Sequence, residues 1–168
     1  MEMYTTSQDD SKNTSSGVFL KIFLTGLIAG TLDGLAAVFL SANGNATLVF
    51  KYISSAVLGA EAFKEGAGVV ALGIGFHYFN AMAFTFFYFF IYPRIPLLRK
   101  HIAMSSLLYG SFIWCVMNLC VVPMSRISSG PYSLNGIVKS WLILVVFVAL
   151  PVAIGIREIY LSKKTDLI

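Results

Sequence analysis

Long apolar stretches alternate with short polar ones along most of this chain. A helix needs about 20 mainly apolar residues to cross the hydrocarbon core of a bilayer. Four stretches reach that length, and they predict membrane-spanning helices over about 18–41, 67–92, 102–124 and 137–160. The pattern therefore predicts an all-α integral membrane protein, folded as a four-helix bundle.

A fifth apolar stretch, 46–60, has a different pattern. Lys51 interrupts it, and its apolar residues recur at steps of three and four, which is the spacing of one helix face. Since this stretch is too short to span, we predict an additional short amphipathic helix on the outer face of the membrane.

The composition agrees with a membrane protein. Of the 168 residues, 57% are hydrophobic and only 12% are charged, whereas soluble domains carry about 25% charged residues. The length predicts one membrane domain over 18–160. It is flanked by a flexible polar tail over 1–17 and a cytoplasmic tail over 161–168.

The lysines and arginines predict the orientation. With both termini in the cytoplasm, eight lie on the cytoplasmic side and four on the outer side: Lys12, Lys21, Arg94, Arg99, Lys100, Arg157, Lys163 and Lys164 against Lys51, Lys64, Arg126 and Lys139. Cytoplasmic loops are enriched in these residues, so we predict a cytoplasmic N-terminus and C-terminus. The net charge of +4 is thereby explained by topology. The expected partner is the lipid bilayer rather than a nucleic acid.

Few polar side chains fall inside the predicted spans, and ionisable groups in a bilayer are usually functional or paired. They are Asp33, His77, Asn80 and Asn118. At about 1.5 Å per residue, Asp33 lies roughly 12 Å from the outer end of its span, His77 roughly 15 Å and Asn118 roughly 9 Å. We therefore expect one polar layer in the outer half of the membrane, which is the candidate ligand or proton site.

Three glycines precede and follow Asp33 on one face of the first span. Gly26, Gly30 and Gly34 recur at four-residue steps, and small residues let membrane helices approach closely. We expect this face to be a helix-packing surface that carries Asp33 toward the other spans.

The pair Asp33 and His77 has two interpretations. In the first, it is a buried pair that fixes the register of two helices. In the second, it is a proton-titratable or ligand-binding site, which predicts a bundle whose stability depends on pH if the two groups touch. Haem is not expected, because ligation by two histidines needs a second one at depth, and His101 lies in a turn.

Two prolines lie in the last two spans. Pro123 is expected to end the third helix, because proline cannot continue the helical hydrogen bonds. Pro151 lies well inside the fourth span and is expected to kink it.

The order of several segments resembles the YagU-like family of small bacterial inner-membrane proteins, a domain of unknown function. These segments are GLIAGTLDGLAA, SSAVLGAEAFKEG, LGIGFHYFNAMAF and VMNLCVVPMS, and the resemblance covers about 18–160. It implies a multi-pass protein of the bacterial inner (cytoplasmic) membrane, with no assigned chemistry and no catalytic residues to carry over.

Three functions remain open from the sequence. The first is a small non-enzymatic membrane protein whose polar layer binds or conducts a small species such as protons, with a homo-oligomer if it forms a pore. The alternative is a structural or accessory subunit of a larger membrane complex. The third is an intramembrane enzyme, but the chain offers no convincing nucleophile or metal-ligand set beside the His–Asp pair. We therefore expect no catalytic residue, no metal and no cofactor.

Overall fold

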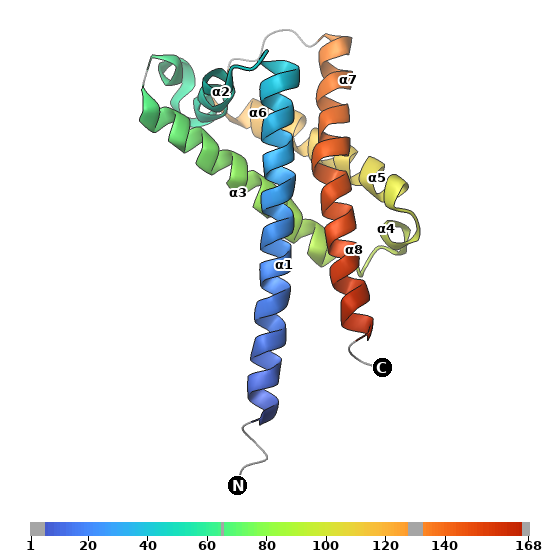
Figure 1. Ribbon diagram of the computed structural model, residues 1–168. Coiled ribbons are helices and arrows are strands. Elements are labelled where there is room, and N and C mark those ends of the chain that lie inside the picture. The colour runs from blue at the N-terminus through green and yellow to red at the C-terminus, as the bar shows by residue number, and fades with distance from the viewer. Residues whose placement is uncertain (1–5, 65, 128–132, 166–168) are drawn as a thin grey trace.

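The computed structural model describes residues 6–64, 66–127 and 133–165, and every element in these ranges is helical (Figure 1). This confirms the prediction of an all-α protein. In chain order the elements are α1 (Thr6–Ala36), η1 (Ala37–Ser41), α2 (Ala46–Leu58), η2 (Gly59–Phe63), α3 (Ala67–Ile91), α4 (Pro96–Lys100), α5 (Ile102–Cys115), η3 (Val116–Val121), α6 (Val122–Met124), α7 (Leu134–Ile143), η4 (Leu144–Ala149) and α8 (Leu150–Thr165).

Five helices among the described residues are long and apolar enough to cross a membrane: Gly17–Ser41, Ala46–Phe63, Ala67–Ile91, Ile102–Met124 and Leu134–Ser162. Four of them coincide with the predicted spans. The additional one contains the stretch that the sequence predicts to be too short. That prediction is wrong in length, because the 3₁₀-helical η2 extends α2 to Phe63.

The first helix begins earlier than the predicted span. The sequence predicts a flexible tail over 1–17, but α1 is helical from Thr6. Adding a residue to an existing helix costs much less than nucleating a new one, so the apolar segment extends its helix into the polar one. Residues 1–5 of the predicted tail, and 166–168 of the other, lie outside the described residues.

The long helices form an oblique bundle. α1 lies beside the continuous helix α7–η4–α8, and α3 and α5 cross them at an angle (Figure 1). α1 also packs along α3, and α5 packs along η4 and α8. Alanine and branched side chains fill the centre, including Ala29, Val148, Val152 and Ile156. We call the end where α1 finishes and α7 begins the upper end, and the opposite one the lower end.

The tightest helix contacts occur at glycines. A Cβ on Gly110 would lie 2.7 Å from the Cα of Val145, and one on Gly155 would lie 2.6 Å from the side chain of Thr25. α5 therefore touches η4, and α8 touches α1, at nearly backbone distance. These contacts agree with the preference of membrane helix interfaces for small residues.

Two tryptophans link α5 to α7. The indole Nε1 of Trp114 donates a hydrogen bond to Ser140 Oγ at 2.9 Å. The indole of Trp141 donates to Ser111 Oγ, also at 2.9 Å. This reciprocal pair holds the two helices in register near the upper end.

Tyrosines hold α3, α5 and α8 together toward the lower end. Tyr88 and Ser105 share a hydrogen bond of 2.5 Å, and the hydroxyl of Tyr109 donates to the carbonyl of Phe84 at 2.5 Å. The hydroxyl of Tyr160 donates to Phe89 O at 3.1 Å. Every hydroxyl named here has a partner, which is what a dry interior requires.

Tyr92 ends this cluster just beyond α3. Burial raises the pKa of the Tyr92 phenol above its ordinary value, although Arg157 and Arg99 oppose the effect. The phenol therefore stays protonated at neutral pH and packs against the ring of Tyr160 at 5.1 Å between centroids.

Three stretches of π-helix interrupt the long helices, at η1, η3 and η4. A π-helical turn holds one more residue than an α-helical turn. Pro123 lies two residues after the end of η3, and Pro151 two residues after the end of η4. A proline ring clashes with the carbonyl four residues earlier, and the wider turn removes that clash. The fourth helix therefore continues past Pro151. The third ends at Met124, one residue after Pro123, where the sequence predicts its end.

Candidate functional site: an apolar pocket with one carboxylate

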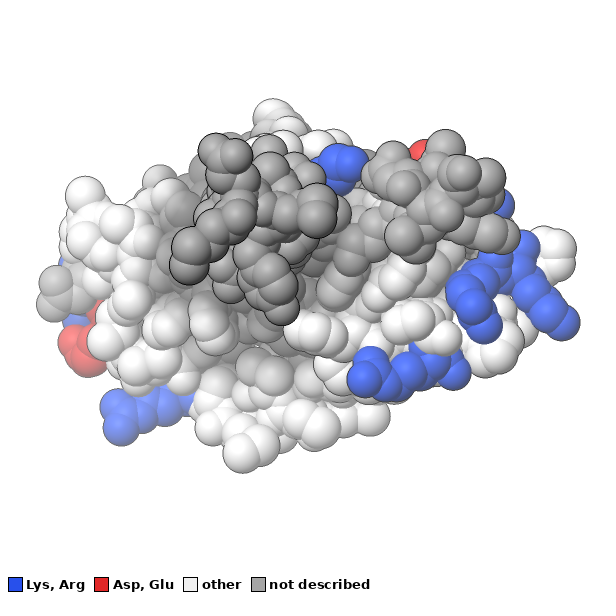
Figure 2. All heavy atoms as spheres, turned by 90° about the horizontal axis from the view of Figure 1, so that it is seen from below, with Lys and Arg blue, Asp and Glu red and all other residues white. Residues whose placement is uncertain are grey.

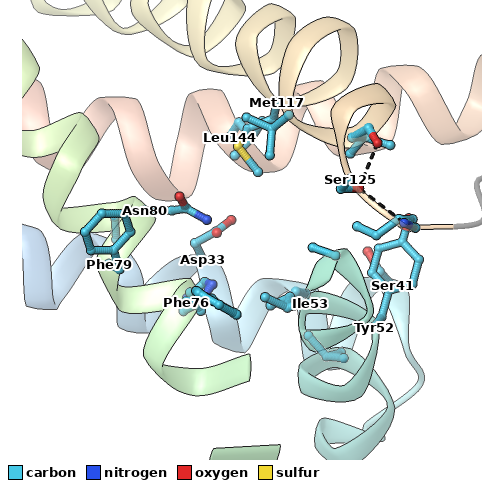
Figure 3. Close-up of a pocket in the computed structure, with 18 of the residues that line it drawn as sticks. Asp33, Ser41, Tyr52, Ile53, Phe76, Phe79, Asn80, Met117, Ser125 and Leu144 are labelled. Carbon is cyan, nitrogen blue, oxygen red and sulfur yellow. Dashed lines mark hydrogen bonds between the residues drawn. The ribbon is translucent and has the colours of Figure 1, made fainter. Parts of the chain in front are cut away.

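A pocket of about 970 Å³ lies in the upper half of the bundle (Figure 3). α1 and η1 line it together with α2, α3, η3, α6 and η4. Its walls are mainly apolar, and they include Val49, Ile53, Ala56, Phe76, Phe79, Met117, Val121 and Leu144. Three of the polar side chains that the sequence singles out, Asp33, His77 and Asn80, also line it.

The carboxylate of Asp33 and the carboxamide of Asn80 point into the same end of the pocket, while Met117 and Leu144 form the facing wall (Figure 3). Both polar side chains are half-buried. In the described part of the chain, neither side chain has a hydrogen-bond partner. The described ion pair, Lys64 with Glu61 at 2.7 Å, lies elsewhere. Asp33 is therefore a carboxylate that the fold exposes to the pocket rather than one that the fold neutralises.

His77 is buried between α1 and α3. Its Nε2–H donates a hydrogen bond of 2.7 Å to the carbonyl oxygen of Gly30, because a carbonyl can only accept. The ring also packs edge-on against Tyr78 and Phe50, at 5.4 and 6.1 Å between centroids. His77 interacts electrostatically with Asp33, but its nearest polar partner is the backbone of α1.

The glycine face of α1 positions these groups. A Cβ on Gly34 would lie 3.2 Å from His77 Nε2, and one on Gly30 would lie 3.0 Å from both Ala81 and Tyr78. Gly26 faces Met82 and Thr85 in the same way. The three glycines therefore let α3 approach close enough for His77 to reach the backbone of α1, as the sequence predicts for a packing surface.

Asn118 lies outside this site. It belongs to η3, and its Nδ2–H donates to the carbonyl oxygen of Trp114 at 3.0 Å. The side chains that the third span turns toward the pocket are instead Ile113, Met117 and Val121. The expected polar layer is therefore made by Asp33, His77 and Asn80, without Asn118.

All three π-helical stretches border the pocket. η1 contributes Ala37, η3 contributes Met117 and Val121, and η4 contributes Leu144 and Val148. π-helical turns occur frequently at functional sites, because they change the direction of side chains at a cost in helix stability. The sequence pattern did not predict these π-helical stretches. Two of the three are followed by a proline, Pro123 or Pro151, which is the signal that could have indicated them.

The described residues of the site form no metal-ligand cluster. Within the described ranges, no group of three His, Cys, Asp or Glu side chains lies close enough to hold a metal ion. Cys115 and Cys120 are both free and exposed. Comparison with known proteins finds nothing: no family model, curated protein or solved structure matches this chain. What the site can do must therefore be inferred from its own geometry.

Proposed function

We propose that this chain is a small multi-pass membrane protein that binds a small amphipathic molecule in the pocket and catalyses no reaction. One observation carries the proposal: a pocket of about 970 Å³ with mainly apolar walls displays a carboxylate that lacks a hydrogen-bond partner among the described residues. Ligand pockets are typically apolar with a few polar groups that orient the ligand.

The open side of the pocket favours a ligand that enters from the bilayer. Phe79 on α3 and Met124 on α6 lie at its rim and are 69% and 87% exposed. In a membrane, apolar side chains exposed at this level contact lipid chains. An amphipathic molecule dissolved in the bilayer reaches such an opening without crossing water.

Binding is better supported than conduction of a small species such as protons. A conduction path needs polar groups or water along the whole membrane. Below the pocket, however, the bundle is closed by the apolar side chains of Ala29, Val152, Ala153 and Ile156, each at most 2% exposed. Asp33, His77 and Asn80 therefore lie in a pocket whose lower end is closed.

We include four spans and two cytoplasmic termini in this proposal, with α2 lying across the outer end. Figure 1 supports it, because α2 is seen nearly end-on at the upper end while α1 runs down the view. Arg94, Arg99 and Lys100 are exposed at the lower end, and lysine and arginine side chains are spread around that face in Figure 2. The resemblance to the YagU-like family and a bacterial inner-membrane location belong to the same proposal.

Saturable photolabelling in nanodiscs tests the binding. The probe is a long-chain alcohol that carries a photoreactive diazirine near its terminal methyl group. We expect labelling of α2, α3 and η3 that unlabelled decanol competes away. Ala37→Trp and Ala56→Phe, which fill the pocket from two different elements, should abolish it.

The control is Ile28→Trp, which places the same tryptophan side chain at an exposed position of α1 (57% exposed). It should leave the labelling unchanged. Labelling that does not saturate in the wild-type protein, or that survives both pocket-filling variants, would overturn the proposed function.

A further inference from the structure

We propose that the ligand of this pocket carries a primary ammonium group on an apolar chain, and that Asp33 binds this group. The inference rests on the proposed function and adds the chemical class of the ligand. It follows from the charge of the pocket, its hydrogen-bonding capacity and the shape of its apolar part.

The pocket lining carries one carboxylate, which interacts electrostatically with His77. Asp33 is the single acid among the lining residues described, and none of these residues is a lysine or an arginine. The nearby cations are directed elsewhere: Lys51 donates to the carbonyl oxygen of Phe63 at 3.2 Å, and the side chain of Arg126 lies against Gly59. A cationic ligand would gain the attraction of Asp33 without repulsion from a lysine or arginine of the described lining.

The polar end of the pocket offers several acceptors, beside the amide donor of Asn80. The two oxygens of Asp33 and the carbonyl of Asn80 are not used by described side chains or backbone. The Nε2–H of His77 donates to Gly30 O, which leaves Nδ1 as an acceptor in the neutral ring. A primary ammonium group brings three donors and no acceptor, so it complements this set. At this end of the described pocket an anionic head group would find donors only in the amide of Asn80, and Asp33 would repel it.

The remaining pocket suits an alkyl chain. Beyond Asp33 it runs between Ile53 of α2 and Met117 and Leu144 of the facing wall (Figure 3). The polar side chain of Ser125, at the far end, is already occupied: its Oγ donates to Val122 O at 2.7 Å and accepts from Ile127 N at 3.2 Å. An apolar chain would therefore leave no described hydrogen-bonding group of Ser125 without its partner.

The experiment compares three competitors of equal chain length against the photoreactive alcohol: decylamine, decanol and decyl sulfate. Each is titrated against the wild type and against Asp33→Asn. Because partition into the bilayer is the same for both proteins, the ratio of the two competition constants isolates the effect of the carboxylate. Glu61→Gln, an acid-to-amide change at an exposed position outside the pocket, is the control.

We expect Asp33→Asn to weaken the binding of decylamine by about tenfold or more, which is the effect of losing a charge-assisted hydrogen bond. The same substitution should change the binding of decanol little and should strengthen the binding of decyl sulfate. Glu61→Gln should leave the binding of all three competitors unchanged. If decanol competes for the pocket but Asp33→Asn weakens competition by decylamine and by decyl sulfate equally, or weakens neither, the ammonium proposal is overturned. The pocket would then remain a binding site. No saturable labelling at all would overturn the proposed function itself.

Discussion

The carboxylate of Asp33 is half-buried in an apolar pocket and forms no hydrogen bond among the described residues. Burying a charge without hydrogen bonds costs free energy. Such a group therefore destabilises the folded protein unless a ligand supplies a hydrogen-bond donor or a positive charge. A residue that mainly fixes helix register would have the opposite effect on stability, so the two interpretations of Asp33 predict opposite outcomes.

We predict that Asp33→Asn raises the free energy of unfolding of the empty protein by about 0.5–2 kcal/mol, the usual size of a stabilising substitution. Unfolding by sodium dodecyl sulfate in mixed micelles measures it. The same acid-to-amide change at Glu61, which is exposed and paired with Lys64, should cost about 0–1 kcal/mol. A clear loss of stability in Asp33→Asn would favour the register role.

Single residues were predictable from the sequence where the helices are regular. Asp33, His77 and Asn80 lie on stretches of uninterrupted α-helix, so counting residues along α1 and α3 places them at one level. The predicted placement of Asn118 beside these residues was wrong, because the π-helical η3 begins at Val116. Its wider turn breaks the four-residue spacing that relates Asn118 to Ser106 and Gly110, and Met117 takes the position facing the pocket.

At the scale of elements, the contact between α2 and α3 depends on one glycine. A Cβ on Gly73 would overlap the carbonyl oxygen of Phe50 and come within 2.9 Å of Ser54 Oγ. Ser54 also donates a hydrogen bond of 2.6 Å to the carbonyl of Val69, two turns of α3 away from His77. Because the obstacle is backbone, α2 as a whole must move to admit a methyl group.

We predict that Gly73→Ala lowers the free energy of unfolding by about 1–3 kcal/mol, the cost of overpacking. It should also weaken labelling of the pocket, because Val49 and Ile53 of α2 line it. Gly75→Ala is the matched control, since its Cβ meets nothing within 4 Å. Equal effects of the two substitutions would show that α2 does not pack on α3 as described.

The elements themselves were largely predictable, and their irregular parts were not. Apolar length marks α1, α3, α5 and α7–α8, because the bilayer imposes that length on any span. The wide turns depend on tertiary packing as well as on local sequence. Pro123 and Pro151 each follow one, but η1 is followed instead by a turn at Asn43 and Gly44, which have positive φ.

For the whole molecule, the choice between four and five spans concerns α2 alone. With η2 it is long and apolar enough to cross, yet an odd number of spans would put the two termini on opposite sides of the membrane. The lysine and arginine distribution argues for an even number, since the positive-inside rule then holds at both termini and in the α3–α4 hairpin. We therefore predict that α2 begins and ends on the same, outer side.

Single cysteines test this in a background with Cys115→Ser and Cys120→Ser. We expect Ala46→Cys, at the start of α2, and Gly66→Cys, after its end, to react with a membrane-impermeant maleimide added outside intact cells. Lys100→Cys, in the lower hairpin, should react only after the membrane is opened, and it serves as the control for sidedness. If α2 instead crosses the bilayer, the first two positions will label from opposite sides. The pocket would then be walled by a fifth span rather than closed at its outer end by α2.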